Sequence, residues 1–133
     1  MAAFLLAATP AGGHETSALA EHVQLQLVKK TGTHFRHRGT ATGTVRGTVS
    51  SVITLDSLSV VGTVTVATRR GRLRLRVSGT ARSGGLRSRF DGTARVTGGT
   101  GRYARARGRG TFRGVVNRRT WAATIDASGT LTL

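Results

Sequence analysis

The sequence predicts a single all-β domain, an eight-stranded antiparallel β-barrel with up-and-down connections. From about residue 22 onward, apolar and polar residues alternate with a period of two, which is the period of a strand and not of a helix. Short turn signals rich in glycine separate the alternating runs. Glycine also recurs inside the runs, mostly as Gly-Thr, and mid-strand glycine is typical of strands that coil sharply to close a small barrel.

Eight alternating runs follow one another along the chain. The expected strands cover residues 22–29, 34–47, 48–56, 59–69, 72–82, 86–97, 104–116 and 119–132. The turn signals between them lie at Lys30–Gly32, Asp56–Ser57, Arg70–Gly71, Ser83–Gly85, Gly98–Gly101 and Asn117–Arg118. Because the connections are short, consecutive strands are expected to pair antiparallel. Eight strands can close into a barrel whose interior holds side chains or one small ligand.

Composition limits the chemistry of the domain. The chain has 133 residues, enough for one domain with a modest core, and no cysteine, which excludes disulfides and thiol chemistry. Lys+Arg number 21 against five Asp+Glu, for a formal net charge of +16. Codon bias explains the choice of arginine over lysine, but not the shortage of acids. The positive field is therefore a physical property of the protein.

The first twenty residues differ from the rest. An apolar run over residues 1–8 ends near Pro10, and Ala18-Leu19-Ala20 then offers a signal-peptidase-like cleavage pattern. We expect residues 1–20 to form a signal-like leader and residues 21–133 the barrel, with export to the cell envelope or beyond. A disordered tail is the alternative, because the leader lacks a basic start. No run reaches the ~20 apolar residues of a transmembrane helix.

A glycine-rich corner lies between two of the expected strands. Two adjacent glycines permit positive φ and close backbone approach, and the aromatic residue after them can plug one barrel end. We expect a structural corner formed by Gly98, Gly99, Thr100, Gly101, Tyr103 and Gly108. The alternative is that these residues border a ligand site. A dinucleotide-binding loop is rejected, because the residues after the glycines are a poor helix.

This corner resembles the pattern hydrophobic-x-G-G-T-G-x-[FY]-x-x-A-x-G of the allene oxide cyclase and dirigent barrels. The resemblance is strongest over residues 92–133 and implies a small bacterial member of that superfamily. Allene oxide cyclases isomerise a fatty-acid epoxide with the help of a carboxylate and a cysteine, and dirigent proteins steer phenoxy-radical coupling with acidic pocket residues. This chain has no cysteine. The resemblance therefore implies a scaffold more firmly than a reaction.

The residues that could carry catalysis are few. Asp91 and Asp126 are expected to point outward by alternation, and Asp56 falls at a turn. The histidines are expected at the surface or at strand ends: His14, His22, His34 and His37. No set has metal-ligand spacing, and no Gly-x-Ser-x-Gly elbow is present. No feature of the sequence demands an enzymatic role or a cofactor.

Arginines occupy the polar positions of several expected strands. The expected outward rows are Arg72, Arg74 and Arg76; Arg87, Arg89 and Arg95; and Arg105, Arg107 and Arg109, with Arg113, Arg118 and Arg119 beyond. Two interpretations remain open: a solvated face that prevents aggregation, or a surface for an anionic polymer or envelope. Aromatic residues make up only 5% of the chain, so base stacking and sequence-specific nucleic-acid recognition are not expected.

Three hypotheses for function follow. The first is a non-catalytic exported barrel that holds one small hydrophobic molecule; the second is an isomerase or coupling guide of the same fold; the third is a basic polyanion-binding protein. The expected barrel lining comprises Leu25, Leu75, Phe90, Tyr103, Phe112 and Trp121. An inner cavity of ~300 Å³ or more with an inward carboxylate or arginine would favour the enzyme.

Overall fold

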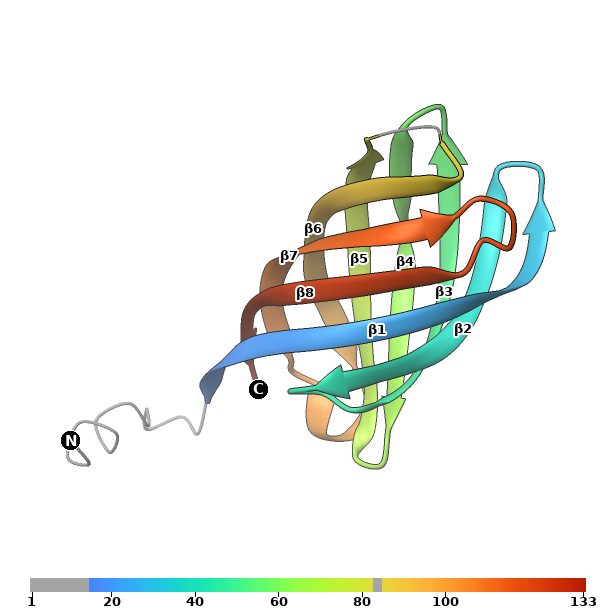
Figure 1. Ribbon diagram of the computed structural model, residues 1–133. Coiled ribbons are helices and arrows are strands. Elements are labelled where there is room, and N and C mark those ends of the chain that lie inside the picture. The colour runs from blue at the N-terminus through green and yellow to red at the C-terminus, as the bar shows by residue number, and fades with distance from the viewer. Residues whose placement is uncertain (1–14, 83–84) are drawn as a thin grey trace.

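A computed structural model describes residues 15–82 and 85–133 as a closed barrel of eight antiparallel strands in meander order (Figure 1). The predicted fold class is confirmed. The strands are β1 (Thr16–Thr31), β2 (His34–Gly43), β3 (Gly47–Asp56), β4 (Ser59–Thr68), β5 (Gly71–Ala81), β6 (Arg87–Gly99), β7 (Arg107–Asn117) and β8 (Ala123–Thr132). A single turn of 3₁₀ helix, η1 (Gly101–Tyr103), lies between β6 and β7.

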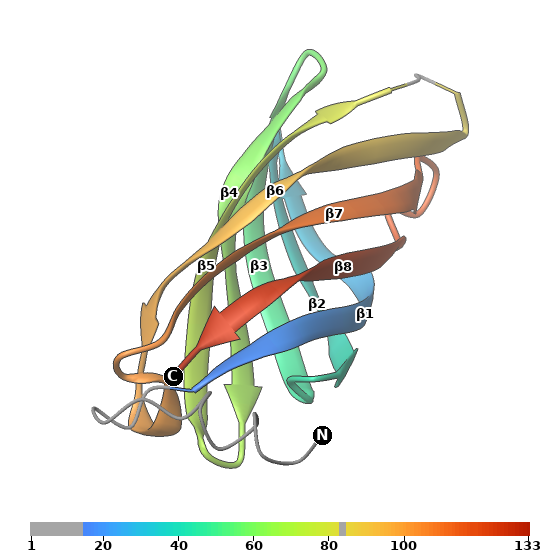
Figure 2. The same ribbon diagram turned by 90° about the vertical axis from the view of Figure 1, so that its left-hand side faces the viewer.

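The ring closes between the first and last strands. β1 pairs with β8 from Thr16 opposite Thr132 to Leu25 opposite Ala123, and it pairs with β2 on its other side. Closure pairs the first strand of the described sheet with the last, which reduces the hazard of edge-to-edge aggregation, while residues 26–31 of β1 pair with β2 alone. β1 and β6–β8 run across β3–β5 at a steep angle, so the barrel is formed by two crossing groups of strands (Figures 1 and 2).

The barrel begins earlier than expected. β1 starts at Thr16 and not near residue 22, so residues 16–20, assigned to the leader, belong to the first strand. The Ala18–Ala20 segment lies opposite Ser128–Thr130 of β8. The physical reason is that alternation continues backward through Leu19, which is half-buried between exposed neighbours. Residues 1–14 lie outside the described residues, and export remains a prediction.

Two other strands begin later than expected. β7 starts at Arg107 because η1 and a turn occupy the preceding residues. β8 starts at Ala123, because Trp121 has a φ of 63° and so cannot continue an extended strand. Alternation alone could not show either break.

The glycines of the corner are needed for two different reasons, positive φ at Gly98 and Gly101 and close backbone approach at Gly99. Gly98 has a φ of 142° and Gly101 a φ of 59°, values that residues with a Cβ rarely adopt. Gly99 serves close approach instead, because a Cβ there would lie 2.1 Å from the carbonyl oxygen of Arg72. Two hydrogen bonds between Thr100 and Arg72 also join the corner to β5. The Thr100 N–H donates to the Arg72 carbonyl over 2.9 Å, and the Arg72 N–H donates to Thr100 Oγ1 over 3.0 Å.

The two ends of the barrel are packed differently. The β2–β3, β4–β5 and β6–β7 connections lie at one end, which we call the closed end (Figure 1). Its apolar side chains are buried: Val45, Val49, Leu73, Tyr103, Ala106 and Leu131. The β1–β2, β3–β4 and β7–β8 connections lie at the opposite end, the open end. Four inward side chains here remain partly exposed, those of Ile53, Leu55, Val60 and Phe90, whereas Phe35, Ala81 and Ser88 are buried.

Candidate functional site

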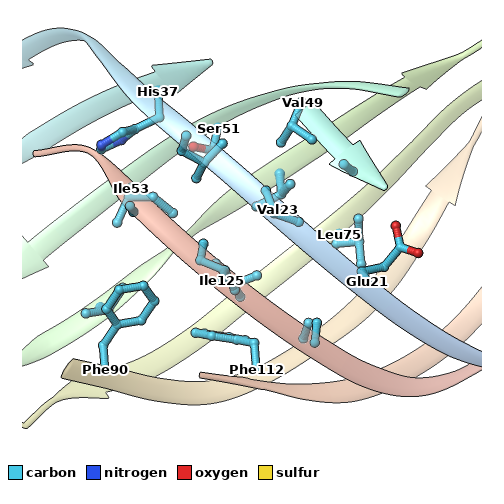
Figure 3. A pocket seen from close by; sticks show the side chains of 18 of the residues that line it. Glu21, Val23, His37, Val49, Ser51, Ile53, Leu75, Phe90, Phe112 and Ile125 are labelled. Atoms are coloured by element: carbon cyan, nitrogen blue, oxygen red, sulfur yellow. The ribbon is translucent and has the colours of Figure 1, made fainter. Parts of the chain in front are cut away.

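A cavity of about 210 Å³ occupies the barrel interior (Figure 3). Inward-facing residues of all eight strands line it, because period-two alternation directs every second side chain to the axis. Five of the six residues expected to line the barrel do so: Leu25, Leu75, Phe90, Phe112 and Trp121. Tyr103 is buried in the packed cluster of the closed end, and the cavity lining does not include it.

The walls of the cavity are mainly valine, leucine, isoleucine and phenylalanine. Its volume of about 210 Å³ is below the roughly 300 Å³ at which sites for drug-sized ligands begin. It is larger than an engineered apolar cavity of about 150 Å³ that binds benzene in another protein. The space therefore suits one compact apolar molecule.

A carboxylate on β1 is part of the cavity lining. Glu21 lines the wall (Figure 3), and its Oε2 accepts a hydrogen bond from the Val45 N–H of the β2–β3 connection over 2.8 Å. Burial raises the pKa of Glu21 above its usual 4.5, and the backbone hydrogen bonds from Val45 and Thr44 offset part of that rise. Sequence reasoning missed this residue because it was placed at the leader boundary. Its shared parity with Val23 and Leu25 was the available signal.

Glu21→Gln is expected to change the pH dependence of stability. Because the folded-state pKa lies above the unfolded value of 4.5, the folded protein binds the proton more tightly. Stability should then be fullest below pH 4.5 and decline as the carboxyl ionises above it. We expect the variant to melt at a higher temperature than the wild type at pH 7, with a difference that shrinks toward pH 4. A difference in melting temperature between the two proteins that stays constant from pH 4 to pH 7 would contradict this.

A histidine and a serine lie next to each other on the wall nearer the open end. His37 of β2 and Ser51 of β3 are directly paired across the two strands, and both side chains point inward (Figure 3). The expectation that His37 lies at the surface is wrong. His37 has the parity of Phe35, a buried residue, and the two therefore share the inner face.

Aromatic and cationic side chains gather at the open end. The rings of Phe35 and Trp121 lie 4.6 Å apart, between centroids. The Lys30 ammonium lies 5.4 Å from the Phe35 centroid, and the Arg118 guanidinium 5.4 Å from that of Trp121, both within cation–π range. Arg118 was expected on the outer face but lines the cavity, because it lies in the β7–β8 loop and not on a strand.

The three candidate aspartates lie outside the barrel, as alternation predicted for Asp91 and Asp126, whereas Asp56 was expected at a turn. Asp91 forms a bidentate pair with Arg82, with both N···O distances 2.8 Å, and the hydrogen bonds from Arg82 lower the pKa of Asp91. Asp126 pairs with His22 over 2.8 Å, and Asp56 is exposed at the end of β3. His34, also exposed, contacts Thr54 Oγ1 at 3.0 Å, while His14 lies outside the described residues. Within residues 15–82 and 85–133, no three histidine or acidic side chains gather to hold a metal ion.

The arginines form a positive outer surface. The strand arginines of the predicted rows are exposed: Arg72, Arg74, Arg76, Arg87, Arg89, Arg95, Arg107 and Arg109. Arg105 is exposed too, but it lies in the turn before β7. Across three strands, Arg76 lies opposite Arg95 and Arg95 opposite Arg109, a set that we call the arginine row. Among the described residues, the ion pairs join His22 to Asp126 and Arg82 to Asp91, and neither involves the row.

Comparison with protein-family models, curated proteins and solved structures finds no match for this chain. In the part of the chain that the structure describes, no helix is long and apolar enough to span a membrane. The function must therefore be argued from the cavity and from the outer surface.

Proposed function

We propose that the barrel binds one small hydrophobic molecule in its interior without transforming it. The observation that supports this is an apolar cavity of about 210 Å³, with several inward side chains partly exposed at one end. Apolar walls favour an apolar ligand by about 25 cal/mol per Å² of surface removed from water. The closed barrel and the glycine corner also support kinship with the allene oxide cyclase and dirigent barrels as a proposal.

The positions of the polar groups favour binding over catalysis. His37 lies opposite Leu27 of β1, six residues along the strand from Glu21. Six residues of strand span about 20 Å. An acid and a base must both reach the same reacting centre to act on it together, and these two groups are too far apart to do so.

Filling the cavity tests the proposal. Ala94 of β6 lines the cavity, and the adjacent Thr93 is exposed on the outer face. Ala94→Phe is expected to weaken the binding of naphthalene more than tenfold, because the new ring occupies the ligand's space. Isothermal calorimetry would measure it.

Thr93→Phe is the matched control, since it adds the same ring to the outside, and it should bind naphthalene like the wild type. A folded Ala94→Phe protein with wild-type affinity would contradict the proposal. So would a wild-type protein that binds no naphthalene.

We propose a second function, contact with an anionic polymer, on the basis of the arginine row. Side chains directly opposite in an antiparallel pair lie about 5 Å apart, and like charges so placed repel. The register sets Arg76, Arg95 and Arg109 side by side with no described ion pair to neutralise them. Phosphate or sulfate groups could relieve this repulsion by bidentate hydrogen bonds with the guanidinium groups.

Replacing the arginine row by glutamine is expected to weaken binding to mixed-sequence duplex DNA, used here as a polyanion. The slope of log affinity against log salt should fall by about three, one for each lost phosphate contact. A control that replaces Arg36, Arg38 and Arg46 by glutamine removes the same charge from another part of the molecule. Equal changes in both triple variants would show that net charge, and not the row, governs binding.

A further inference from the structure

Two polar atoms in the cavity wall have no hydrogen-bond partner. They are His37 Nδ1 and Ser51 Oγ, and the residues are only 7% and 5% exposed. A buried polar atom without a partner has lost its hydrogen bonds to water and gained none in return, so such atoms are rare and need an explanation. Here both atoms belong to one cross-strand pair of residues, and the two residues line the same cavity (Figure 3).

The hydrogen bond made by Nε2 of His37 determines whether the other ring nitrogen, Nδ1, donates or accepts. His37 Nε2 lies 2.7 Å from the carbonyl oxygen of Trp121. A carbonyl oxygen only accepts, so Nε2 carries the proton and donates it. In the neutral ring Nδ1 is then an acceptor, while the Ser51 hydroxyl can both donate and accept. The wall thus presents an acceptor beside a donor.

One ligand group satisfies both atoms. We propose that the cavity selects an apolar molecule with a hydroxyl group, which donates to His37 Nδ1 and accepts from the Ser51 hydroxyl. This inference rests on the proposed binding function and names the chemistry of its ligand. The body of the ligand lies against the apolar wall between this pair and Glu21, and the volume limits it to one or two fused rings or a comparable aliphatic body.

A serine beside a histidine also suggests a nucleophile and its base. Acyl transfer would in addition need backbone N–H donors aimed at the developing oxyanion. Ser51 lies within β3, which pairs with β2 and β4, so the strand amides around it lie in the plane of the sheet and bond to neighbouring strands. The geometry therefore favours recognition of a hydroxyl group over attack on an ester.

The test compares 2-naphthol with naphthalene, which differ by one hydroxyl group. Calorimetry on the full chain would give the ratio of the affinity for 2-naphthol to the affinity for naphthalene. We expect Ser51→Ala and His37→Leu each to lower this ratio about tenfold, as the loss of one hydrogen bond implies, with little change in naphthalene binding. Ser50→Ala, which removes the exposed hydroxyl one residue away, should leave the ratio unchanged.

The outcomes separate the two proposals. If naphthalene binds but the ratio is the same in the wild type and both variants, the hydroxyl inference is wrong and the binding function stands. If neither probe binds the wild type, the binding function itself falls. Should His37→Leu fail to fold, Ser51→Ala decides alone, because it deletes one oxygen from a small side chain.

Discussion

Replacing Gly99 by valine is expected to leave little folded protein. A Cβ at this position would lie 2.1 Å from the Arg72 carbonyl oxygen and 2.8 Å from Tyr103 Cβ. Neither obstacle is the movable end of a side chain, so β5 and β6 would have to separate where the corner joins them. We expect a loss above about 4 kcal/mol, comparable to the entire stability of many domains of this size.

The measurement is soluble yield together with thermal unfolding followed by circular dichroism. Gly85→Val is the control, because a Cβ on Gly85 meets nothing within 4 Å. The control should melt within a few degrees of the wild type. If Gly99→Val melted there as well, the close approach between the corner and β5 would not be needed for closure.

The fold was predictable because its signal is local. Period-two alternation depends only on the strand having one inner and one outer face, and it recurs in every strand of this barrel. The eight strands and their order follow from the runs and the short turns between them. The breaks at Trp121 and at η1 were not predictable, because a positive φ and a 3₁₀ turn leave no trace in the alternation.

The inward position of the polar cavity residues was also predictable from period-two alternation, provided that the alternation is applied to every residue type. His37 was expected at the surface or at a strand end, although its parity matches that of the buried Phe35. Glu21 was passed over because it was placed at the leader boundary, although it continues the inward series of Val23 and Leu25. The volume of the cavity, by contrast, depends on how side chains from eight strands meet, which no single strand determines.

The arginine row shows what register adds to a strand pattern. Sequence alternation predicted arginines along each strand but not which ones face each other between strands. Between β5 and β6 the register shifts, with Arg74 opposite Gly98 and Leu75 opposite Val96. Without this bulge Arg76 would lie opposite Val96, an inward residue, and not opposite Arg95. A one-residue irregularity thus aligns the positive charges of three strands.

Tyr103→Ala is expected to destabilise the barrel by about 3–5 kcal/mol, the range for truncating a buried aromatic ring. Tyr103 is 7% exposed and belongs to the core cluster of the closed end, where Ala106 and Leu73 are also buried. Its removal would leave a void that the β5–β6 bulge and η1 cannot collapse to fill, since hydrogen bonds from Thr100 to β5 and from Arg102 to the β4–β5 turn hold the corner in place. Chemical unfolding would measure the loss, with Tyr103→Phe as the control that keeps the ring. A Tyr103→Ala protein within about 1 kcal/mol of that control would mean that the ring does not support the closed end, and that the glycines and backbone hydrogen bonds of the corner suffice to close the barrel.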